Sequence, residues 1–231
     1  MTESKSSAWI LVISSIFVAL FSAPALGQTK QLWPELDVYV KINPITRLYF
    51  SAARTKENGD STDTDFSVSI DFHIKPLVSL KNNRARDESK SKLLLLRAGF
   101  HYIPSRDGPT ENRIALDAIP RLPLKAGIVA TARNRLELRF INGDFSWRFR
   151  HRPGIERNFA IRSYEITPYA RAEFYYDSTY GKWSRTALTG GCIFPIRKHS
   201  EMEAYYEHQN KTEKSPNLQL SAIGIQLNLY F

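Results

Sequence analysis

Apolar and polar residues alternate one by one along most of the sequence, and this period of two restricts the fold more than any other feature. In residues 66–74 (FSVSIDFHI) the first residue and every second one after it are apolar, and the others are polar. A helix would scatter both sets around its surface, whereas a strand places one set on each face. The pattern recurs in residues 36–42, 133–140, 145–152, 166–177 and 201–207. We therefore predict an all-β chain.

Clusters of turn-forming residues, such as ENGDSTD, SRDGPT and DSTYGK, divide the alternating segments into strands. Eleven strands are predicted, near residues 35–43, 45–54, 64–75, 92–103, 111–121, 129–141, 145–157, 164–177, 183–197, 200–210 and 216–231. Most of them are longer than the roughly five or six residues usual for strands in a soluble β-sandwich, so an antiparallel transmembrane β-barrel is favoured over a secreted sandwich. Bacterial single-chain barrels normally have an even number of strands. We expect 12 strands, with 10 as the alternative, and an uncounted strand before Pro34 or between Pro76 and Ser91.

The start of the sequence has the pattern of a signal peptide. Lys5 precedes an apolar run of 14 residues from Ala8 to Phe21, and small residues (SAPALG) follow. A membrane anchor is the alternative, but a spanning helix needs about 20 apolar residues. We predict that residues 1–27 are removed, with cleavage after Ala25 as a second option, and that residues 28–231 form one barrel domain.

The last nine residues (IGIQLNLYF) place Ile223, Ile225, Leu227, Leu229 and Phe231 on one face of a strand. An alternating final strand with an aromatic last residue resembles the signal by which the outer-membrane assembly machinery captures its substrates. We predict that Ile225, Leu227, Leu229 and Phe231 form this signal. The expected location is the outer membrane of a Gram-negative bacterium, and the expected partners are outer-membrane lipid and the assembly machinery.

The charge balance is basic, with 32 Lys and Arg against 23 Asp and Glu and a formal net charge of +9. Such a charge would fit a nucleic-acid partner, but the predicted export signal argues against one. A basic lumen or attraction to anionic lipid headgroups explains the charge equally well. The basic segment Lys81 to Lys92 (KNNRARDESKSK) is interpreted as a solvated loop at the periplasmic end, with a specific partner as the alternative.

Six short motifs follow one another along the chain: RNRLELRF (133–140), WRFRHR (147–152), TPYARAEFYYD (167–177), WSR (183–185), YYEHQ (205–209) and the closing LNLYF. This ordered series resembles that of a known family, the predicted outer-membrane barrels catalogued as domain of unknown function 2490. The likeness covers most of the chain after residue 27 and is clearest from about residue 111 onward. It implies an outer-membrane location and a barrel fold, and it implies no activity.

If the apolar strand faces meet lipid, the polar faces line the lumen, and their charges become candidate functional groups. Two arginine-rich strands are joined by a tight Asn-Gly-Asp turn, so six guanidinium groups are predicted on one wall. The predicted lumen cluster is Arg133, Arg135, Glu137, Arg139, Arg148, Arg150, Arg152, Arg171 and Glu173, with Asp117, Glu203 and Glu207 facing the same interior. Either these side chains fill a narrow barrel as a hydrogen-bonded network, or a basic wall opposes an acidic wall across a pore.

Two further patterns concern glycine and the aromatic residues. Gly190-Gly191 lies in an alternating strand, where glycine usually marks a bulge or a tight bend. Aromatic residues near the predicted strand ends are expected to form girdles at the level of the lipid headgroups. These residues are Trp33, Tyr102, Tyr176, Trp183, Tyr206 and Tyr230.

No catalytic or metal-binding motif is recognisable among the five histidines or elsewhere. His208, beside Glu207 and close to a predicted external loop, is the strongest candidate for a lipid hydrolase with a Ser–His pair. We predict neither a catalytic residue, nor a metal, nor a cofactor, and expect a monomeric barrel that acts as a small passive pore or a structural envelope component. A lipid-modifying hydrolase and a docking platform for an envelope complex are the alternatives.

Overall fold

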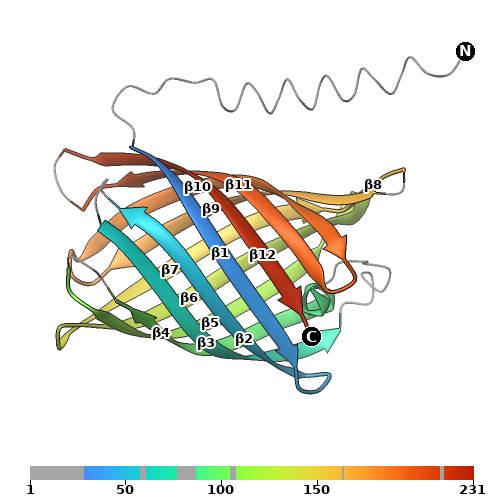
Figure 1. Ribbon diagram of the computed structural model, residues 1–231, viewed down its shortest axis with the longest axis horizontal. Helices are drawn as coiled ribbons and strands as arrows, with labels where there is room; N and C mark the ends of the chain where they lie inside the picture. Colours follow the sequence, from blue (N-terminus) through green and yellow to red (C-terminus); the bar gives the residue numbers. More distant parts are fainter. Residues whose placement is uncertain (1–28, 58–60, 77–86, 105–107, 163, 214–215) are drawn as a thin grey trace, which may run out of the picture.

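The computed structural model describes residues 29–57, 61–76, 87–104, 108–162, 164–213 and 216–231, in which eleven strands close into a barrel (Figure 1). The barrel strands are β1 (Thr29–Lys41), β2 (Thr46–Glu57), β3 (Ser61–Pro76), β4 (Lys92–Ile103), β5 (Glu111–Pro123), β6 (Ile128–Ile141), β7 (Asp144–Arg157), β9 (Tyr164–Asp177), β10 (Lys182–Arg197), β11 (Ser200–Lys211) and β12 (Leu218–Tyr230). Three short elements are not part of the ring of strands: the 3-10 helices η2 (Glu88–Ser91) and η3 (Lys125–Gly127), and strand β8 (Phe159–Ile161), which pairs with β9. The prediction of an all-β barrel is confirmed.

The predicted number of strands, 12 or 10, is wrong. All neighbouring barrel strands are antiparallel except β12 and β1, which pair in parallel from Thr29–Leu220 to Tyr39–Tyr230 and close the ring (Figure 1). A parallel closing pair requires an odd number of strands, whereas the even-number rule assumes antiparallel closure throughout. The stretch before Pro34 is the first part of β1 rather than a separate strand, and its pairing with β2 begins only at Glu35.

Burial along the strands is reversed relative to a soluble protein. In β3 the outward residues Phe66, Val68 and Phe72 are each more than two-fifths exposed, while the inward Ser69 is buried and Asp71 is 0% exposed. Every barrel strand contributes at least one exposed large apolar side chain, so the apolar surface runs around the whole barrel. The polar set of each alternating segment is therefore the one that fills the interior.

The two ends of the barrel carry different elements. The chain ends beside η2, and η3, β8 and the turn at residues 198–199 lie at that same end, which we call the C-terminal end (Figure 1). The N-terminus of β1 lies at the opposite end, with the turn at residues 142–143. The predicted signal peptide, residues 1–27, lies outside the described residues. Among the residues that are described, no helix is long and apolar enough to cross a membrane.

Glycines on β10 and β12 make room for tyrosines that fill the interior. A Cβ placed on Gly224 would lie 1.9 Å from Cζ of Tyr205, and one on Gly191 would lie 2.5 Å from the hydroxyl of Tyr169. The expected bulge at residues 190–191 is not found, because the pairing of β10 with both neighbours is continuous there. The absent side chain of Gly191 instead permits the close approach of an aromatic ring.

Candidate functional site

Cross-strand pairing places charges of alternating sign next to each other on the inner wall. Asp71 on β3 lies between Arg47 on β2 and Arg97 on β4, with Nε–carboxylate distances of 2.6 Å to each. Asp117 on β5 lies opposite Arg135 on β6, and their Nε–Oδ1 distance is 2.8 Å. Directly opposed residues of unlike charge stabilise antiparallel strands, so this row holds β2 to β6 together from within.

Glu137 on β6 is the centre of the most crowded cluster and is 0% exposed. Its carboxylate lies 2.6 Å from Arg148 and 3.0 Å from Arg150, both on β7. Arg113 on β5 and Arg135 on β6 each lie 3.5 Å away. Four guanidinium groups thus share one carboxylate, and the cluster lies in the lumen toward the opposite end.

The remaining predicted lumen residues also lie on the inner wall, but they divide among several clusters rather than forming one. Arg139 pairs with Glu111 at 2.7 Å and with Asp177 at 3.1 Å. Arg133 shares Asp117 with Arg135. The other pairs are Arg150 with Glu173 at 2.9 Å and Arg171 with Glu203 at 3.1 Å, while Glu207 accepts hydrogen bonds from Thr189 and Gln209. Among the described residues, no carboxylate lies within ion-pair distance of Arg152.

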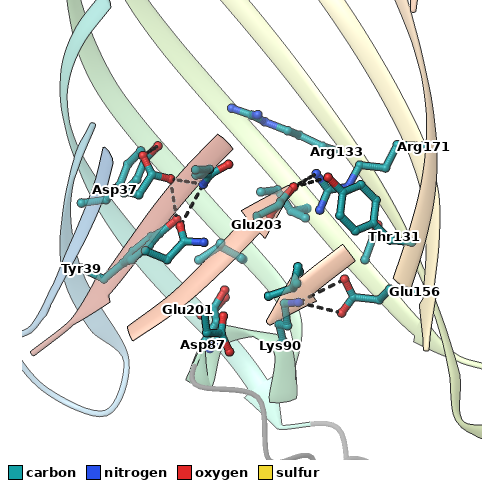
Figure 2. A pocket seen from close by; sticks show the side chains of 18 of the residues that line it. Asp37, Tyr39, Asp87, Lys90, Thr131, Arg133, Glu156, Arg171, Glu201 and Glu203 are labelled. Carbon is teal, nitrogen blue, oxygen red and sulfur yellow. Dashed lines mark hydrogen bonds and ion pairs between the residues drawn. The ribbon is translucent and has the colours of Figure 1, made fainter. Parts of the chain in front are cut away.

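A cavity of about 240 Å³ occupies the half of the lumen nearer the C-terminal end. Figure 2 shows Asp37 and Tyr39 on one side of it and Arg133 and Arg171 on the other. Tyrosines supply much of the remaining wall: Tyr39 stacks between Tyr49 and Tyr230, with ring centroids 4.9 and 5.0 Å apart. The cavity is therefore lined by charged and phenolic groups.

The element η2 reaches into the lumen at the C-terminal end. Arg47 lies 2.6 Å from the carboxylate of Asp87, Arg121 donates to the backbone carbonyl of Ser89 at 2.8 Å, and Lys90 pairs with Glu156 at 3.2 Å. Ser89 is 0% exposed. The interpretation of Lys81 to Lys92 as a solvated loop is wrong for its last part, since residues 87–91 are bound inside the barrel; residues 81–86 lie outside the described residues.

Neighbouring charges, rather than burial, determine the direction in which the pKa values of Asp87 and Lys90 are shifted. Burial alone would raise the pKa of Asp87, but the cations Arg47, Arg121 and Lys90 outweigh it and hold that pKa well below its usual range. Burial would lower the pKa of Lys90, and the carboxylates of Glu156 and Asp87 reverse this and raise it. Both groups are therefore charged at neutral pH, and η2 is fixed in the lumen by ion pairs.

The aromatic residues predicted to form a girdle divide between the outer and the inner face of the barrel. Tyr102, Trp183 and Tyr206 point outward and are exposed. Trp33 instead packs inside against Leu220, and Tyr230 lines the cavity and donates to Glu201. Both residues share the inward positions of their strands with polar neighbours, and that alternation, rather than nearness to a strand end, decides their direction. Of the predicted assembly signal, Ile225, Leu227 and Phe231 are exposed on the outer surface and Leu229 is half-buried.

The hydrolase alternative has one geometric feature in its favour. Nδ1 of His208 lies 3.2 Å from Oγ of Ser221 on the neighbouring strand, and Tyr206 also donates to that oxygen at 2.9 Å. Glu207, however, bonds to Thr189 and Gln209, and in the described chain no carboxylate contacts the imidazole. Ser221 is 5% exposed. The described residues also contain no group of three or more His, Cys, Asp or Glu side chains placed to hold a metal ion.

The fold and the lumen define the class as closed β-barrels with an interior of paired charges and an apolar exterior. A family model described as a protein of unknown function (DUF2490) matches residues 30–219. The chain therefore belongs to that family, and the match covers every strand of the barrel up to the start of β12. No curated protein matches the sequence.

Proposed function

We propose that this chain is an integral β-barrel of the outer membrane of a Gram-negative bacterium, with lipid around its outer surface. The reversal of burial is the observation that carries the proposal: Asp71 and Glu137 are 0% exposed, whereas Leu188 is 62% exposed. Monomeric soluble proteins rarely expose large continuous apolar surfaces. Because the apolar surface surrounds the barrel, lipid fits it better than a partner protein with a single patch.

Within that location, the role that the interior supports best is a closed, structural barrel rather than an open pore. The Glu137 cluster occupies the lumen toward one end, and η2 is bound in it at the other. Long side chains that pair with each other leave little free bore in a barrel of this size. The ring closes within one chain, which favours a monomer, and the exposed final strand fits recognition by the assembly machinery.

Two measurements on the refolded full chain test this proposal. In phospholipid vesicles the folded protein should float with lipid and should migrate faster on a gel before boiling than after it. In planar bilayers it should show no steady conductance. Failure to associate with vesicles would contradict the membrane location, and stable ohmic steps would contradict the closed lumen while leaving the location intact.

A further inference from the structure

Charges of opposite sign are segregated around the lumen cavity. Among the described residues, seven carboxylates and seven cations line it. Five of these carboxylates come from β1 and β11, which supply none of these cations. The five are Glu35, Asp37, Glu201, Glu203 and Glu207. The cations are Arg47, Lys90, Arg97, Arg121, Arg133, Arg152 and Arg171, on the other strands and on η2. An electric field therefore crosses the cavity between the wall that carries the arginines and the wall formed by β1 and β11.

Three carboxylates of the acidic wall are held by neutral donors only. Asp37 accepts hydrogen bonds from Tyr49 at 3.0 Å, from Tyr39 at 3.1 Å and from Gln226 at 2.8 Å. Glu35 accepts one from Ser51 at 3.4 Å, and both donors to Glu207 are uncharged. In the described part of the chain none of the three has a cation within ion-pair distance. Buried carboxylates without a counter-charge at ion-pair distance either take up a proton or are stabilised by the arrival of a cationic group.

The opposite wall has a matching surplus of positive charge. Arg152 on β7 lies opposite Arg133 on β6, and of the described residues no carboxylate pairs with Arg152. Arg133 itself shares the single carboxylate of Asp117 with Arg135. Among the described residues, neither guanidinium group has a carboxylate to itself at ion-pair distance. The two groups lie side by side and together suit a carboxylate.

We propose that the cavity binds a small zwitterionic solute that carries an ammonium group at one end and a carboxylate at the other. The ammonium group contacts Glu35, Asp37 and Glu207, and the carboxylate contacts Arg152 and Arg133. The cavity of about 240 Å³ is larger than the engineered cavity of about 150 Å³ that binds benzene. It therefore has room for a solute of about eight non-hydrogen atoms. This inference rests on the proposed closed barrel, since an open bore would not retain the solute.

Calorimetric titration of the refolded full chain in detergent tests the inference with three solutes of equal chain length. These are 5-aminopentanoate with both charges, pentylamine with only the cation and pentanoate with only the anion. The zwitterion should bind saturably and about tenfold more tightly than either singly charged solute, the size expected from one additional charge-assisted hydrogen bond. Equal binding of all three solutes, or none by the zwitterion, would overturn the proposal.

Two variants assign the ends of the solute. Arg152→Gln should weaken binding of 5-aminopentanoate about tenfold and leave pentylamine unchanged, whereas Glu35→Gln should weaken both. The matched controls are Arg157→Gln and Asp144→Asn, which remove the same charges at exposed positions outside the cavity. If the Arg152 and Arg157 variants behave alike, the assignment is wrong.

Folding and binding are separable in these experiments. Faster gel migration before boiling than after it reports that a variant is folded. If the Arg152 variant does not fold, the proposal is tested by the Glu35 variant and by the relative affinities of the wild-type protein for the three solutes. A protein that inserts into vesicles but binds no zwitterion refutes the cavity assignment and leaves the proposed membrane barrel standing. A protein that binds the zwitterion but does not associate with vesicles refutes the membrane location instead.

Discussion

Replacing Glu137 by Gln should destabilise the barrel more than any other isosteric change of one lumen carboxylate. The substitution keeps the shape but removes, in a position with no exposure to solvent, the carboxylate that pairs with both Arg148 and Arg150. Among the described residues it is the only carboxylate paired with Arg148, whereas Arg150 also pairs with Glu173. Removing one partner of a buried ion pair costs about 3–5 kcal/mol. At about 1.4 kcal/mol for each factor of ten, this is a loss of at least about a hundredfold in the folding equilibrium.

The free energy of unfolding can be measured by guanidinium titration of the protein in lipid vesicles, with tryptophan fluorescence as the signal. Asp144→Asn, at an exposed position, is the control and should change it by less than about 0.5 kcal/mol. Arg148 contacts no other carboxylate among the described residues, so Arg148→Gln added to the Glu137 variant should recover part of the loss. A cost below about 1 kcal/mol for the Glu137 variant, or strict additivity of the two changes, would refute the buried-cluster reasoning.

Three further predictions concern a glycine contact inside the barrel, the ion pairs of η2 and the hydrolase alternative. Gly224→Ala should cost about 1–3 kcal/mol of stability in the same titration, because its Cβ would overlap the ring of Tyr205, whereas Gly190→Ala, with nothing within 4 Å, should be close to neutral. Because the pKa of Asp87 is held below its usual value, the ionised carboxylate contributes its full stabilisation above about pH 4, and this is lost only as the pH falls through the lowered pKa. Hydrogen exchange should therefore show the η2 amides protected at pH 5. Asp87→Asn should abolish that protection at neutral pH. Incubation with phospholipid should release no fatty acid, with or without calcium, and a release that Ser221→Ala abolishes would establish the hydrolase alternative.

The alternation of residues predicts most of the fold, because in a barrel the two strand faces meet environments of opposite polarity. All eleven predicted strand segments correspond to barrel strands, and the inward side of β6 and β7 follows directly from their arginines. Sequence pattern does not determine how the ring closes. The even-number rule therefore added a strand that the parallel pairing of β1 with β12 makes unnecessary.

The pairing of charges inside the lumen depends on register and on tertiary contacts, which a single sequence does not specify. Glu35 and Asp37 were visible as polar residues between apolar neighbours in β1, and the same signal identifies them as inward, but only the ring places them across the cavity from Arg152. Residues 87–91 show no alternation, so composition alone indicated a solvated loop. Their burial follows from the contacts with Arg47, Arg121 and Glu156, three residues far from them in sequence.

The measurement that tests the central claim most directly is the collision rate of single nitroxide labels in β3 with oxygen and with a water-soluble nickel chelate. Labels are introduced one at a time at residues 66–74 of the vesicle-bound protein, in a Cys192→Ser background that removes the only native cysteine. We predict that oxygen collisions rise at the outward positions Phe66, Val68, Ile70, Phe72 and Ile74 and fall at the four residues between them, with low nickel collisions at the outward positions. High nickel collisions at Val68 and Phe72 would show that the apolar surface faces water, and would contradict the account.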